Sequence, residues 1–285
     1  MRVAITADLH YGAHAASDAA VRMLAGRMME RAPDVIVIAG DVAVADPRKL
    51  VAALCLFADS PARKLVIPGN HDLWSRDGGA DSSAIWERLF SESARLGGFH
   101  RLDGAPIVVD GAGGSVGFVG SIGWYDYSFA DGRLGVPRET YAGKELPGVA
   151  RWNDGRFIRW RHDDEGFTRL AVDLLRRDLA AVSGRAQQIV AATHHVPFAE
   201  LVVRRSHRGW MFADAFLGAR ALGETLLAEP KVRLAVSGHS RHGRAVEIAR
   251  IHAATIGTTP AAKRALFYEI GSDGVRALPA EEASA

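Results

Sequence analysis

The chain has 285 residues, 48% of them hydrophobic and 24% charged, and a formal net charge of +2 at pH 7. This composition is typical of a soluble globular enzyme with a large core, and the small net charge gives no sign of a nucleic-acid or membrane partner. No apolar stretch approaches the ~18 residues of a membrane span, and the N-terminus has no signal-peptide pattern. The one cysteine, Cys55, lies in an apolar run, so we expect a core thiol and a cytoplasmic protein.

Short apolar runs alternate with helical patterns along the first hundred residues. β-branched runs bounded by Gly and Asp are typical of strands buried on both faces, and their alternation with helices predicts βαβ units. We expect residues 280–285 to fray. The predicted strands are 3–7, 35–39, 65–67, a hairpin within 106–120, 188–193, 232–237, 244–248, 252–256 and 266–270, and the predicted helices are 15–31, 50–58, 82–96, 168–182 and 213–227.

Asp, His and Asn side chains follow five of the predicted strands. In open α/β sheets, ligands bind outside the carboxyl ends of the strands, so these side chains are expected to converge. A single Gly-Asp after a strand is usually a turn and a helix cap, but turn chemistry does not explain the pattern at five strand ends. The side chains are Asp8 and His10, then Asp41, then Asn70, His71 and Asp72, then His194 and His195, and finally His239 and His242.

The mixture of side chains predicts the kind of ligand. Carboxylates and imidazoles with one amide oxygen and no thiolate suit Mn, Fe, Zn or Ni, and we favour Mn. Two aspartates and at least four histidines are too many for one ion. They predict two divalent metal ions ~3.5–4 Å apart, a site that clamps an in-line displacement.

The same motifs carry a family resemblance. In order and spacing, Asp8-x-His10, Gly40-Asp41, Gly69-Asn70-His71-Asp72, Thr193-His194 and Gly238-His239 resemble the five signature motifs of the calcineurin-like metallophosphoesterases. The resemblance implies an α/β fold, in which a two-sheet β-sandwich is flanked by helices in αββα layers, with a dinuclear metal centre at the strand ends. It also implies a metal-dependent phosphoric ester hydrolase.

The resemblance implies a role for each metal-site residue. Asp8 and His10 would hold the first metal, and Asp41 would bridge both. Three further ligands would complete the second metal: Asn70, His194 and His239.

The stretch Gly69 to Asp72 supplies the expected catalytic residues. A hydroxide that bridges the metals would attack phosphorus, and His71 would donate a proton to the leaving oxygen or stabilise its charge. Asp72 is expected to orient an imidazole. Gly69 would permit a tight turn and a close backbone approach.

The last motif departs from the family pattern Gly-His-x-His. Arg241 stands where an imidazole of the first metal is expected, and a guanidinium does not ligate a metal. Either His242 supplies the missing nitrogen, or the first site has one ligand fewer and Arg241 grips a phosphoryl oxygen. Of the adjacent pair His194 and His195, we expect His194 to be the ligand and His195 a neighbour.

Residues 121–168 are expected to form an insertion within a single domain that spans 1–285. This stretch contains nine aromatic side chains, Trp124 and Tyr125 among them, and seven Lys or Arg against eight Asp or Glu. The rings form either a small aromatic sub-core or a lid that lines the substrate pocket. The balanced charge gives no basic stripe for a long nucleic acid.

The stretch Arg204 to Trp210, "RRSHRGW", is a compact basic loop. Arg204, Arg205 and His207 are candidate contacts for a substrate phosphate. The alternative interpretation is a solvated surface.

We expect hydrolysis of small phosphate esters, with diesters favoured over monoesters. Two alternatives remain. One is a DNA-processing nuclease of the same superfamily, which predicts salt-sensitive DNA binding. The other is a non-catalytic binding scaffold with this fold, comparable to the retromer scaffold subunit.

Overall fold

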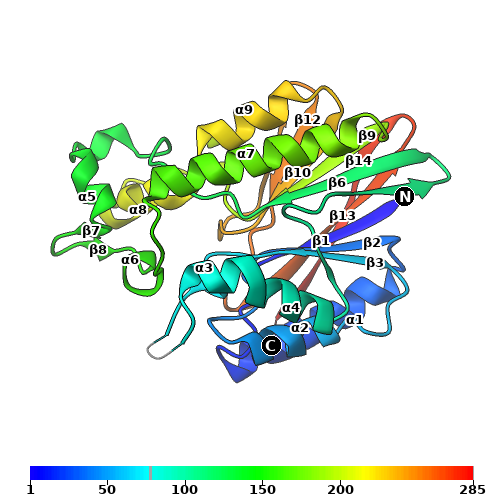
Figure 1. The fold of residues 1–285 in the computed structure, drawn as a ribbon, viewed down its shortest axis with the longest axis horizontal. Helices are drawn as coiled ribbons and strands as arrows, with labels where there is room; N and C mark the ends of the chain where they lie inside the picture. The colour runs from blue at the N-terminus through cyan, green and yellow to red at the C-terminus, as the bar shows by residue number, and fades with distance from the viewer. Residues whose placement is uncertain (77–78, 285) are drawn as a thin grey trace.

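Two six-stranded sheets form the centre of the computed structural model, which describes residues 1–76 and 79–284 (Figure 1). The first sheet has the order β14-β13-β1-β2-β3-β4. Within it, β1, β2, β3 and β4 run parallel, and β13 pairs antiparallel with both β1 and β14. Its strands are β1 (Arg2–Thr6), β2 (Val35–Ala39), β3 (Arg63–Ile67), β4 (His100–Arg101), β13 (Ala262–Gly271) and β14 (Gly274–Ser284).

The second sheet has the order β11-β12-β10-β9-β6-β5. Its central strands β12, β10, β9 and β6 are parallel, and the antiparallel hairpin β5–β6 confirms the one predicted for 106–120. The strands are β5 (Ile107–Gly111), β6 (Gly114–Ser121), β9 (Gln188–Thr193), β10 (Val232–Ser237), β11 (Arg244–Ile248) and β12 (Ile251–Thr255).

Helices cover the outer face of each sheet (Figure 1). On the first sheet lie α1 (Ala15–Glu30), α2 (Pro47–Cys55) and α4 (Phe90–Leu96), which follows α3 (Ser82–Ala84) and a π-helical turn, Ile85–Leu89. On the second lie α7 (Asp164–Ser183) and α9 (Arg220–Ala228). This arrangement confirms the predicted αββα layers. No described helix is long and apolar enough to cross a bilayer.

The strand β2 shows why the sheets stack in this way. All five of its residues are buried. Ile36 and Ile38 pack among the helices on one face, whereas Val35, Val37 and Ala39 pack between the two sheets. Successive side chains of a strand point to opposite faces, so an unbroken apolar run predicts burial on both.

Two terminal or surface predictions are wrong. Residues 280–284 do not fray but belong to β14, since they pair with β13 and Ala283 packs in the core beside α1. The Cys55 thiol is not in the core, because Cys55 is exposed at the end of α2. There, Leu50, Ala53 and Leu54 form the buried face of the helix.

The prediction of one helix over 213–227 is also wrong, because the helix is interrupted near Gly218. The chain forms α8 (Arg208–Ala213), a 3-10 turn at Asp214–Phe216, and then α9. Gly218 forms a bridge with Val196, so close that an added Cβ would lie 1.9 Å from the Val196 carbonyl oxygen. The backbone must leave the helix to make this contact.

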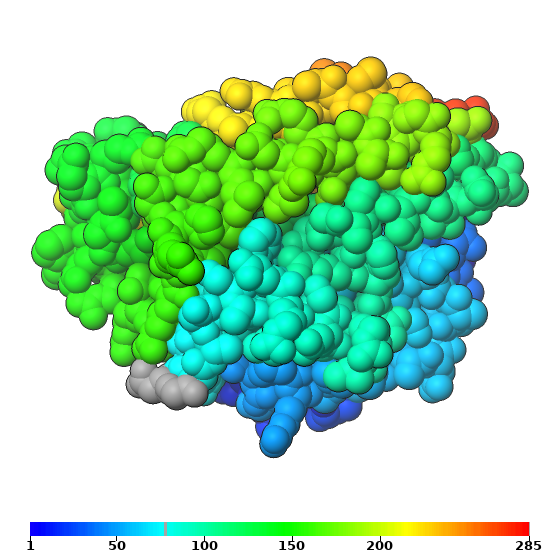
Figure 2. All heavy atoms as spheres, in the orientation of Figure 1, coloured from blue at the N-terminus to red at the C-terminus, as the bar shows by residue number. Residues whose placement is uncertain are grey.

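The insertion forms a lobe at one end of the sandwich (Figures 1 and 2). Its elements are α5 (Arg138–Ala142), the two-stranded sheet of β7 (Glu145–Leu146) and β8 (Ala150–Arg151), and α6 (Asp154–Phe157). A separate aromatic cluster packs the lobe against α8. Trp124 and Tyr125 belong to it and are fully buried, which favours the sub-core interpretation of these rings.

Candidate metal centre

The loops after five parallel strands bring the motif residues to one edge of the sandwich. Asp8, Asp41 and Asn70 follow β1, β2 and β3 of the first sheet. His194 and His239 follow β9 and β10 of the second. Since parallel strands end at the same edge of a sheet, the sequence pattern alone implied this meeting point.

The backbone of the site adopts unusual conformations. Asp8, His10, Asp41 and His239 have φ angles of 56°, 46°, 54° and 62°, in the left-handed region that non-glycine residues seldom occupy. Such residues cluster at functional sites, where the surrounding structure holds them in place. Gly69 is needed for close approach, because a Cβ there would lie 2.1 Å from Oδ1 of Asp41.

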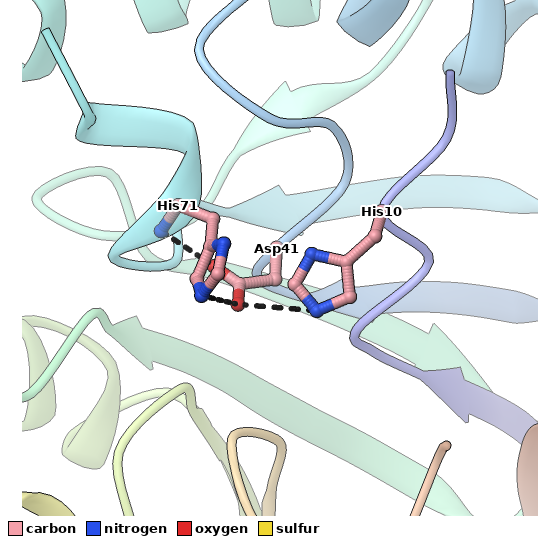
Figure 3. A group of neighbouring side chains, drawn as sticks. All are labelled: His10, Asp41 and His71. Atoms are coloured by element: carbon pink, nitrogen blue, oxygen red, sulfur yellow. Dashed lines mark hydrogen bonds and ion pairs between the residues drawn. The ribbon is translucent and has the colours of Figure 1, made fainter. Parts of the chain in front are cut away.

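Asp41 lies between two groups of donor atoms. Its Oδ2 is 3.6 Å from Nε2 of His10 and 3.9 Å from Nε2 of His71 (Figure 3). Its Oδ1 is 3.4 Å from Nε2 of His194 and accepts a hydrogen bond from the His71 backbone N–H at 2.9 Å. Among the described residues, two groups can hold a metal: His10, Asp41 and His71, and Asp41, His194 and His239. Their shared carboxylate suits a bridging ligand.

The second group shows that a cation fits. Nδ1 of His194 lies 3.0 Å from the Ala39 carbonyl oxygen, which assigns the ring proton to Nδ1 and leaves a lone pair on Nε2. That Nε2 faces Oδ1 of Asn70 at 3.0 Å, and the Asn70 Nδ2 donates elsewhere, to Asp154. Two lone pairs therefore face each other with no proton between them. A metal ion in contact with both atoms would remove this repulsion.

In His239 a backbone carbonyl also fixes the tautomer, but here the proton is on Nε2 and not on Nδ1. Nε2 lies 3.2 Å from the Phe216 carbonyl oxygen, so it carries the proton and Nδ1 is free to ligate. Burial lowers the pKa of His239 to about 3 and that of His194 to about 3. Both rings are therefore neutral near pH 7, as a metal-ligating imidazole must be.

The first group is less complete. The Asp8 carboxylate belongs to neither donor group and instead accepts the His239 backbone N–H at 3.0 and 3.1 Å. Burial raises the pKa of Asp8 to about 7, although the His239 N–H, Lys263 and Arg241 all act to lower it. Asp8 as a ligand of the first metal stays a prediction.

Arg241 is exposed, and its side chain makes no hydrogen bond or ion pair with another described residue. His242 does not replace the missing imidazole in this structure. Its Nε2 contacts Nη2 of Arg205 at 2.5 Å, and it is in neither donor group of the described chain.

His71 is a partly exposed member of the first group. Its ring stacks on Trp74 with centroids 3.7 Å apart, and its Nε2 faces Asp41. Burial lowers the pKa of His71 to about 4, so the ring is neutral near pH 7 and offers one N–H.

The predicted role of Asp72 is wrong in this structure. Its carboxylate does not orient an imidazole; it accepts the backbone N–H groups of Val42, Ala43 and Gly69 at 3.2, 2.9 and 2.9 Å. It thereby fixes the loop of Asp41 against the loop of Asn70. Three backbone N–H groups from two neighbouring loops thus take up the hydrogen-bonding capacity of this buried carboxylate.

Several candidate substrate residues have structural contacts instead. Trp124 and Tyr125 are fully buried, so they do not line an open pocket. Arg204 donates to Asp214 at 3.0 Å, and His207 caps α8 by accepting the Gly209 N–H at 3.2 Å. Of this set, only Arg205 lines a pocket next to the donor groups.

His195 is buried beside the donor groups without joining them. Its Nδ1 contacts the Ile122 carbonyl oxygen at 2.8 Å, its Nε2 has no partner among the described residues, and its ring lies 4.3 Å from that of His239. His195 as a neighbour of the ligands stays a prediction.

Sequence reasoning missed two buried charged residues. Asp154, from α6 of the insertion, accepts the Asn70 Nδ2 at 2.9 Å and so turns the amide oxygen toward His194. Lys263, on β13, is fully buried and donates to the Asp8 carbonyl oxygen at 3.0 Å. Neither residue belongs to a motif. A charged residue in an insertion, or near the end of a strand, is ordinarily exposed.

Comparisons with known proteins agree with this geometry. The sequence profile of the calcineurin-like phosphoesterases matches residues 1–242, and no curated protein matches the chain. The fold resembles that of phosphopantetheinyl hydrolase from Mycobacterium tuberculosis, with a TM-score of 0.69 and 18% identity over 89% of this chain and 88% of that one. It also resembles a dimetal phosphatase from Danio rerio, with a TM-score of 0.58 and 14% identity over 100% of this chain and 98% of that one.

A third similar structure is GAP50 of Plasmodium, described as the anchor in the inner membrane complex. Its TM-score is 0.52, with 11% identity over 100% of this chain and 88% of that one. At these identities the three structures show a shared fold alone.

Proposed function

The chain belongs to the calcineurin-like phosphoesterase family, and from that premise we propose that it hydrolyses small phosphate esters, diesters in preference to monoesters, with Mn as its metal. The observation that supports this most directly is the pair of donor groups that share Asp41. A carboxylate between two sets of imidazoles suits two metal ions that hold one phosphoryl group. No cluster of cysteines competes for the site, since the chain has a single cysteine.

The metals, when bound, would supply an activated water and neutralise charge on the phosphoryl oxygens. The protein's own side chains position the candidate metal ligands. Asp72 holds the loops of Asp41 and Asn70 together, and Asp154 turns the Asn70 oxygen into the site. His71, neutral and stacked on Trp74, presents an N–H that would bind the leaving oxygen. Arg241, which lies outside the two donor groups, would hold a phosphoryl oxygen of the substrate.

The two alternatives have weaker support. A DNA-processing nuclease would need a basic track, and the insertion carries nearly equal numbers of both charges. A binding scaffold would not need two donor groups that share one carboxylate, nor strained backbone at four of the site residues. Lack of DNA binding at low salt would eliminate the nuclease.

The proposal is tested with purified protein, Mn and bis(p-nitrophenyl) phosphate, compared with p-nitrophenyl phosphate. We expect turnover of both, with the larger kcat/KM for the diester, and we expect Asp41→Asn to abolish it because both donor groups lose their shared charge. His14→Ala, an exposed histidine outside the site, is the matched control and should keep full activity. Absence of turnover with Mn, Fe, Zn and Ni would contradict the proposal.

A further inference from the structure

A pocket of about 230 Å³ adjoins the second donor group. His239 belongs both to its wall and to the metal-binding group, so the pocket begins one side chain away from the reacting centre. Its volume is below the roughly 300–1,000 Å³ of sites that enclose a drug-sized ligand. The pocket therefore suits a small group attached to the substrate.

The lining of this pocket is positively charged. Arg205 and Arg241 both line it, and the one carboxylate in its wall, Asp214, is buried and paired with Arg204 at 3.0 Å. The charge that faces a ligand is therefore that of the two guanidinium groups. Arg241 is also near enough to the donor groups to act against the burial-induced rise in the pKa of Asp8.

Arg205 is held in place before any ligand binds. Its guanidinium carbon lies 4.6 Å from the centroid of the Trp210 ring, and its Nη2 contacts Nε2 of His242 at 2.5 Å. Only this one of the five N–H donors of a guanidinium is used in a described hydrogen bond. A fixed guanidinium with free donors is typical of phosphate recognition, since less entropy is lost when it binds.

We propose that this pocket binds a second phosphate group of the substrate, held by Arg205 and Arg241, while the ester that reacts lies at the donor groups. The inference rests on the proposed function, and it names the substrate class as small esters with two phosphate groups a few bonds apart. Val203, Leu217 and Trp152 supply the apolar part of the wall, against which the connecting carbons would pack.

The test compares two ligands that differ by one phosphate: adenosine 5′-phosphate and adenosine 3′,5′-bisphosphate. Their Kd values are measured by titration calorimetry on the Mn-loaded full-length protein. We expect the bisphosphate to bind at least about tenfold more tightly to the wild type, as a charge-assisted bidentate contact allows. In Arg205→Ala this ratio should fall close to one, and Arg205→Lys should be intermediate because an ammonium lacks the planar fork.

Arg208→Ala is the matched control. Arg208 is exposed at the start of α8, three residues from Arg205, but lies outside the pocket lining, so its loss should leave the ratio unchanged. A ratio near one in the wild type, an unchanged ratio in Arg205→Ala, or an equal fall in Arg208→Ala would each overturn the proposal. Failure of the proposed function would show separately, as absence of turnover of bis(p-nitrophenyl) phosphate, while the Kd ratios would still decide whether the pocket binds the second phosphate.

Discussion

At the scale of single residues, Asp154 connects the insertion to the candidate metal centre. This buried carboxylate accepts four hydrogen bonds, from Asn70, Trp74, Trp152 and Tyr125, at 2.9, 2.7, 2.8 and 3.0 Å. Three of the donors are aromatic side chains, and two of these, Trp152 and Tyr125, belong to the insertion itself. The insertion thus fixes the side chain of Asn70, a candidate metal ligand, a role that neither the lid nor the sub-core interpretation anticipated.

We predict that Asp154→Asn weakens Mn binding by about 10–100-fold, the usual effect of removing a group that orients a ligand. The amide of the variant has a single acceptor oxygen, so it cannot serve all four donors and the Asn70 side chain is freed to rotate. Binding is measured by titration calorimetry, and folding by circular dichroism at the same temperature.

The control for this prediction is Asp164→Asn. Asp164 also anchors the insertion, through Trp124 at 2.9 Å and Lys144 at 2.5 Å, but it touches no metal donor. The Asp164→Asn variant should have a lower free energy of unfolding and an unchanged affinity for Mn. Equal losses of affinity in the two variants would mean that any loosening of the insertion disturbs the site.

At the scale of elements, α7 buries a carboxylate that costs stability. Asp178 accepts the Gly104 N–H at 2.8 Å, yet burial raises its pKa to about 6, compared with about 3.9 in a free chain. A raised native pKa means that the folded state disfavours the charged form. The cost is absent below about pH 4, grows between pH 4 and 6, and is constant above that range.

We therefore predict that Asp178→Asn stabilises the protein at pH 7.5 by about 1–2 kcal/mol and has little effect near pH 4. The amide oxygen still accepts the Gly104 N–H, so only the buried charge is removed. Thermal unfolding of both proteins at the two pH values measures the difference. Asp173→Asn, on the exposed face of the same helix, should shift Tm little at either pH; stabilisation by Asp178→Asn that does not depend on pH would contradict the argument.

Prediction from sequence succeeded where an element is defined by local pattern. The apolar runs of β2 and β3 and the residues that follow them could be read directly, since burial on both faces leaves an unbroken apolar signature. Prediction failed where contacts between residues far apart in the sequence determine where an element begins or ends. The break at Gly218 depends on Val196, and the ordered end of β14 depends on β13 and α1. The sequence of residues 280–284 gives no sign of their pairing with β13 or of their packing against α1.

The same distinction holds for the candidate site. The residues of the five motifs are brought together because strand order fixes where loops meet, and this can be inferred from sequence. Asp154 and Lys263 reach the site from an irregular insertion and from a strand at the other end of the chain. Nor does sequence spacing indicate that three backbone N–H groups, and not an imidazole, surround Asp72.

At the scale of the whole molecule, the candidate metal centre lies where loops of the two sheets meet. Asp41 and Asn70 come from loops of the first sheet, and His194 and His239 from loops of the second. Between the sheets lies an apolar core, but the edge at which the loops meet is polar and holds the facing lone pairs of Asn70 and His194. A cation there would hold the two sheets together at this polar edge.

We predict that Mn raises the Tm of the protein. A ligand that binds only the native state stabilises it by about 2.7 kcal/mol at a concentration one hundred times its Kd, which is a rise in Tm of about 4–5 °C in a chain of this size. In His194→Ala the rise should disappear, because the second group loses a ligand and the link between the sheets. The exposed His14→Ala variant should keep the full rise. Thermal scans with chelator and with increasing Mn measure the effect; an equal Mn-dependent rise in His194→Ala would show that the cation acts elsewhere on the protein.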